Sequence, residues 1–254
     1  MKYDTENAVR WNPWHGCHKI SEGCANCWMY SMDKSRGIDS SIVTRSNKFD
    51  FPLETDRQGY WKIPIGTIVL TCFTSDFFIE EADAWRQEAW DIIRQRKDIY
   101  FQILTKRPHR IRECLPADWL DESSNGYPNV ILSISCENQK RTDERLPILL
   151  DIPCHYRIIF CSPMIGPISM NAYLSDKIAS VSVGGENYDN CRPLKYDWVY
   201  DLYRECVAAD VSFNFWDTGT KFVISDKLFL LGDKNTRMEQ AWKSGLRYIS
   251  SKER

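Results

Sequence analysis

The chain has 254 residues and a formal net charge of -2, with 33 Lys and Arg residues against 35 Asp and Glu residues. Hydrophobic residues make up 43% of it and charged residues 27%, which is typical of globular domains and excludes disordered, collagen-like and coiled-coil proteins. A charge near zero also excludes the broad positive field of a general DNA-coating protein. No stretch reaches the roughly 18 apolar residues of a transmembrane helix, and residues 1–6 contain no apolar leader. We therefore expect a cytoplasmic protein with reduced thiols and no membrane partner.

Segments of strand length alternate with segments of helical length along the chain. Residues 24–36 are expected to form a helix, and prolines and glycines are expected to make residues 38–64 an irregular insertion. Apolar runs predict strands at residues 67–73, 99–104, 129–135, 156–161, 179–183 and 211–216, and helices are expected at residues 80–97, 108–114, 139–150 and 196–209.

This alternation indicates the fold class. Strands separated by helices form parallel sheets, because each crossover must return the chain in the same direction. At least six such strands favour an α/β fold built as a partial (β/α) TIM-type barrel of six or seven parallel strands, with an open sheet as the alternative. The chain has no glycine-rich phosphate-binding loop, which weakens that alternative. With no second domain boundary visible, residues 1–254 are expected to form a single domain.

Polar residues follow directly on most of the predicted strands. The carboxyl ends of parallel strands converge on one mouth, where reactive and binding groups gather. The alternative for any one of these residues is structural, because strand-ending Ser, Asp and Asn residues also cap the next helix. The residues that we select as candidate cofactor-binding groups are Lys106, Ser135, Glu137, Asn138, Gly184, Gly185 and Glu186.

Three of the ten cysteines lie close together in the sequence. Cys17, Cys24 and Cys27 form a C-x6-C-x2-C motif in a segment rich in Gly, His and Pro, whereas the other seven are scattered. Three thiolates on a short loop can ligate a [4Fe-4S] cluster or a zinc ion. Zinc would need a fourth ligand, which His15 or His18 could supply. Three cysteines on a cluster leave one iron open for a ligand such as S-adenosylmethionine. The spacing alone leaves cluster, zinc and unmetallated thiols open.

The sequence around these cysteines and in five later blocks resembles a known family. The blocks are residues 11–30, 104–108, 129–147, 160–167, 183–193 and 197–215. They are similar, across nearly the whole chain, to an uncharacterised family from bacteria and their phages that has an N-terminal W-N-P-x-x-G-C motif and is regarded as radical SAM-like. The resemblance implies a partial TIM barrel with a [4Fe-4S] cluster on Cys17, Cys24 and Cys27. It also implies reductive cleavage of S-adenosylmethionine to a 5'-deoxyadenosyl radical, but it implies no particular substrate.

Several features differ from the usual radical SAM pattern, among them two spacings. The first gap of the cysteine motif is six residues rather than three, and the Gly-Gly-Glu segment at residues 184–186 comes late in the chain rather than after the second strand. The late segment is either an analogue of the usual one or only a tight turn.

Lys106 and Arg107 begin the densest basic cluster of the chain. At a strand end they suit a carboxylate or phosphate group, and the alternative is a solvated helix face. The cluster permits a nucleic-acid substrate without requiring one.

These observations lead to a functional expectation. We expect a radical SAM-like iron-sulfur enzyme that acts on an unknown substrate and receives electrons from a donor protein. The alternatives are a zinc-binding nucleic-acid interaction module and a non-catalytic iron-sulfur protein.

Overall fold

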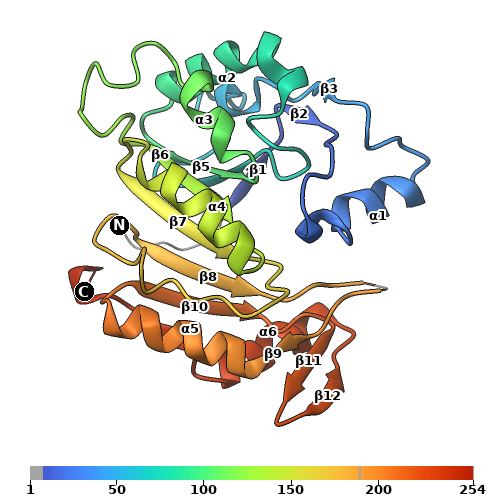
Figure 1. Ribbon diagram of the computed structural model, residues 1–254. Coiled ribbons are helices and arrows are strands. Elements are labelled where there is room, and N and C mark those ends of the chain that lie inside the picture. Colours follow the sequence, from blue (N-terminus) through green and yellow to red (C-terminus); the bar gives the residue numbers. More distant parts are fainter. Residues whose placement is uncertain (1–7, 189, 254) are drawn as a thin grey trace. The chain divides into compact units, whose positions relative to one another are not determined.

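The strands and helices of the chain form a mixed α/β fold (Figure 1). The computed structural model describes residues 8–188 and 190–253, so residues 1–6, where no apolar leader was expected, and residue 189 lie outside the described residues. Eight strands form a mostly parallel sheet in the order β1-β4-β5-β6-β7-β8-β10-β13. They are β1 (Val9–Trp11), β4 (Ile68–Thr71), β5 (Tyr100–Thr105), β6 (Val130–Ser135), β7 (Tyr156–Cys161), β8 (Ser180–Gly184), β10 (Ser212–Asp217) and β13 (Arg247–Tyr248).

Four pairs of neighbouring strands in this sheet run parallel, and the last pair runs antiparallel. β1 pairs with β4, β4 with β5, β7 with β8 and β8 with β10 in parallel, whereas β10 pairs with β13 antiparallel. The α/β class and the parallel sheet are thus confirmed. Closure into a barrel stays a prediction, because β1 and β13 end the order and the described part of the chain shows no pairing between them.

The described residues form six α-helices: α1 (Trp28–Ser35), α2 (Asp83–Gln95), α3 (Pro108–Cys114), α4 (Gln139–Leu150), α5 (Tyr196–Ala208) and α6 (Lys234–Lys243). The helix expected at residues 24–36 is shorter than predicted. A 3₁₀ turn at Glu22–Cys24 precedes it, and the amide of Cys27 donates to the carbonyl of Cys24, so α1 begins only after the last motif cysteine. No helix of the described residues is long and apolar enough to cross a membrane.

The chain divides into two compact units. The described part of the first unit comprises residues 8–18, 33–133 and 151–156, and that of the second comprises residues 19–32, 134–150, 157–188 and 190–253. The expectation of a single domain over residues 1–254 stays a prediction.

Aromatic side chains fill the core of the first unit. Trp11 packs edge to face on Phe101 with ring centroids 5.5 Å apart, and Phe77 packs in the same way on Trp90 at 5.0 Å. Burial of such large rings is a main source of folding free energy, and edge-to-face pairing adds to it. Several of the tryptophans that are abundant in the composition are therefore core residues.

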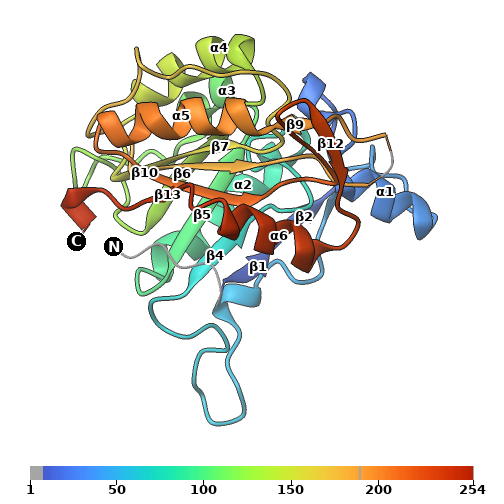
Figure 2. The same ribbon diagram turned by 90° about the horizontal axis from the view of Figure 1, so that it is seen from below.

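The irregular insertion belongs to the first unit. Residues 38–64 contain only the short strand β3 (Thr44–Arg45), the 3₁₀ turn η2 (Phe51–Leu53) and an isolated bridge between Thr55 and Trp61. The bridged loop is the long blue loop at the bottom of Figure 2. Residues 38–64 thus have little regular structure.

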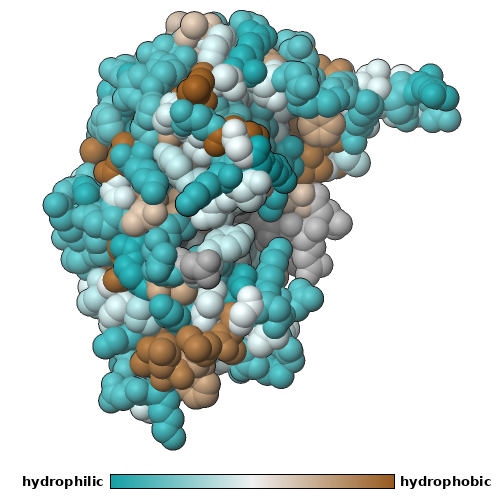
Figure 3. Space-filling view, turned by 90° about the vertical axis from the view of Figure 1, so that its right-hand side faces the viewer, coloured by the Kyte–Doolittle hydropathy of each residue, from teal (hydrophilic) through white to brown (hydrophobic). Residues whose placement is uncertain are grey.

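The second unit is built around β8 and β10. Val181 and Val183 of β8 are paired in register with Phe213 and Phe215 of β10, and α5 lies alongside β10 (Figure 1). A separate three-stranded sheet has the order β12-β11-β9, formed by β9 (Leu194–Lys195), β11 (Lys221–Ile224) and β12 (Lys227–Leu230). All four residues of its edge strand β12 are exposed. Hydrophobic residues form a patch on the surface of this small sheet (Figure 3).

Candidate functional site

The three motif cysteines are distributed over the two units. Cys17 follows β2 (Trp14–His15) in the first unit, whereas Cys24 and Cys27 lie in the second. All ten cysteines are free thiols, and the three motif thiols and Cys114 are half-buried while the other six are buried. Accessible thiols can meet a metal or an oxidant, whereas buried thiols behave as small apolar side chains.

In the first unit, the loop that carries Cys17 is tightly fastened. Gly16 has a φ of +97°, and a Cβ atom there would lie 2.3 Å from the carbonyl oxygen of Ile42, so only glycine fits. Its carbonyl accepts a hydrogen bond from Ser75 Oγ at 2.5 Å, and the amide of Cys17 donates to Ser40 O at 2.8 Å. These contacts fix both polar atoms of the peptide group that joins Gly16 to Cys17.

A buried arginine lies against Cys17. Arg107 donates from Nη1 to Cys17 Sγ at 3.8 Å and from Nη2 to His18 O at 3.1 Å, and it forms an ion pair with Asp76 at 3.3 Å. Burial lowers the pKa of Arg107, but the charges of Asp76 and of the Cys17 thiolate outweigh burial and raise that pKa above its ordinary value. A guanidinium held charged beside a thiol favours its thiolate form.

Asp76 is the centre of this arrangement at the ends of β4 and β5. It accepts hydrogen bonds from Thr105 Oγ1 at 2.7 Å and from the amide of Lys106 at 2.9 Å. The candidate Lys106 is thus placed through its backbone beside the carboxylate that orients Arg107.

Each histidine of the motif contacts a carboxylate. His15 Nε2 lies 2.8 Å from Asp33 Oδ2, and His18 Nε2 contacts Glu81. Within the described residues, no three His, Cys, Asp or Glu side chains are grouped as metal ligands would be.

In the second unit, Glu137 contacts the loop that contains Cys24. Glu137 is fully buried and accepts hydrogen bonds from Ser21 Oγ at 2.5 Å and from Arg145 Nη1 at 2.6 Å. Arg145 also donates to the carbonyl of Ser135 at 2.6 Å. The predicted residues Ser135 and Glu137 therefore share one arginine.

Glu186 contacts the same loop from the end of β8. Its carboxylate accepts hydrogen bonds from Asn26 Nδ2 at 3.0 Å and from Arg192 Nε at 2.9 Å, and Arg192 donates from Nη2 to Glu22 O at 2.8 Å. Burial raises the pKa of Glu186, but the hydrogen bonds from Arg192 and Asn26 outweigh burial and hold that pKa below its ordinary value. Arg192 Nη2 also donates to Glu186 Oε1, so both oxygens of the carboxylate have partners.

The two glycines before Glu186 allow close packing. A Cβ atom on Gly184 would lie 2.8 Å from the indole of Trp216, and one on Gly185 would lie 2.5 Å from Thr218 O. The two glycines thus allow the chain after β8 to pack closely against the end of β10 and the residues that follow it.

Asn138 has the structural role that was the alternative for strand-end residues. Its Oδ1 accepts from the amide of Arg141 at 3.0 Å, which caps the first turn of α4. In the basic cluster, Arg110 pairs with Asp83 and Arg112 with Asp151, so these two arginines have acidic partners rather than presenting unpaired charge.

The comparison with protein families covers almost the entire sequence: one family profile matches residues 5–250. The chain belongs to the DUF5131 family. The description of that family is a protein of unknown function. No curated protein and no solved structure matches the chain.

Four side chains of this DUF5131 protein that complete the second-unit contacts were not predicted from the sequence. They are Ser21, Asn26, Arg145 and Arg192. Ser21 and Asn26 are polar residues inside the cysteine motif, and the arginines follow Glu137 and Glu186 by eight and six residues. The polar residue types inside the cysteine motif could have indicated that these side chains form hydrogen bonds. Their partners could not be predicted, because they are remote in the sequence.

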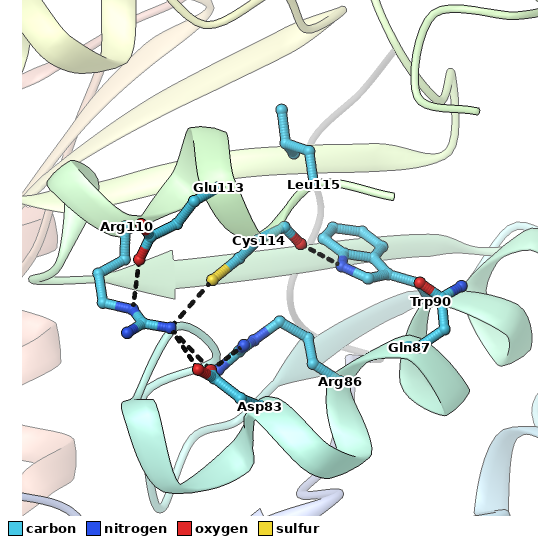
Figure 4. A pocket seen from close by; sticks show the side chains of 8 residues that line it. All are labelled: Asp83, Arg86, Gln87, Trp90, Arg110, Glu113, Cys114 and Leu115. Carbon is cyan, nitrogen blue, oxygen red and sulfur yellow. Dashed lines mark hydrogen bonds and ion pairs between the residues drawn. The ribbon is translucent and has the colours of Figure 1, made fainter. Parts of the chain in front are cut away.

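A pocket of about 480 Å³ lies between α2 and α3 (Figure 4). Its lining includes Asp83, Arg86, Arg110, Glu113 and the half-buried Cys114. The two acidic and two basic side chains balance, and Figure 4 shows them pairing with one another across the wall of the pocket. None of the site residues predicted for the DUF5131 chain lines this pocket.

Proposed function

We propose that this protein is a radical SAM-like iron-sulfur enzyme in which Cys17, Cys24 and Cys27 bind a [4Fe-4S] cluster. The observation that carries the proposal is the contrast among the thiols: the three motif thiols are half-buried and lie in loops fastened by charged side chains, whereas six others are buried. The parallel sheet is consistent with the partial barrel that this function would use.

The donor chemistry suits a cluster better than a zinc ion. Thiolates are the usual ligands of iron-sulfur clusters, and Arg107 favours the thiolate form of Cys17. A closed zinc site would need His15 or His18 as a fourth ligand. The Nε2 atoms of both histidines already contact carboxylates, which leaves only their Nδ1 atoms for a zinc ion.

Two buried polar atoms support a polar ligand at the ends of β8 and β10. Trp216 Nε1 and Asn187 Oδ1 have no hydrogen-bond partner among the described residues. Buried polar groups are nearly always satisfied, so a donor and an acceptor left over at strand ends fit a ligand that carries both. We assign S-adenosylmethionine to this region, together with Ser135, Gly184 and Gly185.

When bound, the cluster and S-adenosylmethionine would supply an electron and a carbon-centred radical for hydrogen abstraction. The chain's own residues would bind and orient these groups and exclude water, which is the usual contribution of the protein to cofactor chemistry. An electron donor protein and a substrate, for which a nucleic acid is one option, complete the proposal.

Anaerobic purification followed by iron and sulfide analysis tests the cluster. We expect about four iron and four sulfide per chain. The single variants Cys17→Ala, Cys24→Ala and Cys27→Ala should lose this content, whereas the control Cys114→Ala, at another half-buried thiol, should keep it. Cys24→Ala protein with full iron and sulfide would refute the ligand assignment.

Incubation of the reconstituted protein with dithionite and S-adenosylmethionine tests the enzyme. We expect 5'-deoxyadenosine and methionine as products, measured by mass spectrometry. A cluster without cleavage would make the protein a non-catalytic iron-sulfur protein. A colourless protein with one zinc, lost in the His15→Ala or His18→Ala variant, would indicate the zinc-binding nucleic-acid module instead.

A further inference from the structure

We propose that Glu137 and Glu186 are positioning residues that hold the loop of residues 21–27 in shape for metal binding, Glu137 through Ser21 and Glu186 through Asn26 and Arg192. The proposal names a role for two buried carboxylates that the cofactor chemistry does not use. It rests on the proposed function only for the identity of the metal group, because the contacts lie within the second unit and involve the chain alone.

The first contact set joins Glu137 to the start of the loop. One oxygen of Glu137 accepts from Ser21 Oγ at 2.5 Å and the other from Arg145 Nη1 at 2.6 Å. Ser21 Oγ in turn lies 3.7 Å from Cys24 Sγ. Glu137 is fully buried, and a buried charge is tolerated only when it is paired and hydrogen-bonded. The Ser21 hydroxyl is therefore held by a fixed acceptor next to a candidate metal ligand.

The second contact set joins Glu186 to the end of the loop. Asn26, the residue before Cys27, donates from Nδ2 both to Glu186 Oε2 and to Asn190 O, each at 3.0 Å. Arg192 pairs with Glu186 and also donates to the carbonyl of Glu22 at 2.8 Å. The carboxylate and its arginine thus contact the loop at two points on either side of Cys24.

The loop needs such external contacts because it has little regular structure of its own. Between residue 19 and the start of α1 it contains only the three-residue turn Glu22–Cys24. Groups that orient metal ligands from outside typically change metal affinity by about 10- to 100-fold when they are removed. Asn26 donates to Oε2 of Glu186 and Arg192 to both oxygens, so we assign Glu186 to the loop rather than to the cofactor.

The test removes the loop-side donors and leaves the buried ion pairs intact. Glu137→Gln would leave Arg145 buried without a counter-charge and could unfold the protein. Ser21→Ala and Asn26→Ala avoid this, since each glutamate keeps its arginine. Asn171→Ala, at an exposed position of the same unit, is the matched control, and Ser21→Thr is the conservative variant that should restore the parental behaviour.

The first measurement is made on the full-length protein without metal. Iodoacetamide labelling of each thiol is followed by mass spectrometry. We expect Cys24 to react severalfold faster in Ser21→Ala and Cys27 severalfold faster in Asn26→Ala, with Cys17 and Cys114 unchanged. Unchanged rates at Cys24 and Cys27, or an equal increase at all four half-buried thiols, would overturn the proposal.

The second measurement uses protein reconstituted with iron and sulfide. We expect the cluster of both variants to be lost to a chelator about 10- to 100-fold faster than in the parent and in Asn171→Ala, with an altered electron paramagnetic resonance spectrum. Parental loss rates and spectra would also overturn the proposal. If the parent binds no iron, the proposed function fails, and the labelling rates alone then decide the role of the two glutamates.

Discussion

A glycine occupies position 23 because the side chain of Glu137 fills the space where another side chain would begin. A Cβ atom on Gly23 would lie 2.3 Å from Glu137 Cγ and 2.5 Å from its Oε1. The backbone of Gly23 is not in the left-handed region, so the requirement is one of space and not of conformation. Glu137 cannot move aside easily, since Ser21 and Arg145 hold both of its oxygens.

Gly23→Ala should therefore destabilise the protein. We expect a loss of about 1 to 3 kcal/mol in the free energy of unfolding, measured by urea denaturation, because overpacking a filled site forces its neighbours to shift. Gly232→Ala is the control, since a Cβ atom there meets nothing within 4 Å. Its free energy of unfolding should stay within about 0.5 kcal/mol of that of the parent. Equal urea midpoints for both variants would show that the Glu137 side chain can move to make room for the added methyl group.

At the scale of an element, the end of α2 anchors the irregular insertion. Arg96 is buried and donates to the carbonyls of Ile63, at 2.9 Å, and of Pro52, and its guanidinium lies 4.5 Å from the ring centroid of Trp61. Asp98 pairs with the same guanidinium at 2.8 Å. One side chain thus links three points of an insertion that has almost no hydrogen-bonded strands of its own.

Arg96→Ala should release the insertion. We expect rapid trypsin cleavage at Arg57 and Lys62 under native conditions and a loss of about 2 to 4 kcal/mol in the free energy of unfolding, because buried carbonyls lose their donor. Arg94→Ala removes only exposed ion pairs, which contribute about 1 kcal/mol or less, and should not change the cleavage pattern.

The same anchor predicts a dependence of stability on pH. The hydrogen bonds from Arg96 hold the pKa of Asp98 below its ordinary value. A carboxyl whose folded pKa is depressed adds stability that is complete above its unfolded pKa, near 3.8, and that is lost as pH falls through the folded pKa. The urea midpoint should therefore fall less steeply with pH below 3.8 in Asp98→Asn than in the parent. Parallel pH curves would contradict this linkage.

At the scale of the whole molecule, exposure divides the ten cysteines into two classes. Cys17, Cys24, Cys27 and Cys114 are half-buried, and the six others are buried. Burial also raises the pKa of Cys72, which lowers its thiolate fraction and its reactivity. Cys114, outside the motif, serves as an internal reference for every labelling experiment.

Iodoacetamide should therefore label four thiols in the native, metal-free protein and all ten only after unfolding. After reconstitution with iron and sulfide we expect Cys17, Cys24 and Cys27 to be protected and Cys114 to react as before. Peptide mass spectrometry measures each site separately. Fast labelling of Cys72 in the native protein would contradict the assigned burial, and protection of Cys114 would place metal at an unexpected site.

Local patterns were enough to predict most of the regular structure. All six strands expected from apolar runs are present as β4, β5, β6, β7, β8 and β10, and the helices expected at residues 108–114 and 139–150 have those bounds in the structure. The strands β1, β9, β11, β12 and β13 and the helix α6 were not predicted. All four residues of β12 are exposed, so its sequence lacks the alternation of apolar and polar residues that marks a half-buried strand.

The candidate site divides in the same way. The cysteine motif and the polar strand ends are visible in the sequence, because residue type and strand length are local properties. The partners of those residues are not local: Ser21 meets Glu137 across 116 positions, and Asn26 meets Glu186 across 160. A buried carboxylate is stable only with a donor on each oxygen, and folding alone selects which remote side chains supply them. The amino-acid pattern thus shows where thiols and carboxylates occur, and the tertiary packing decides that two of those carboxylates fasten the cysteine loop.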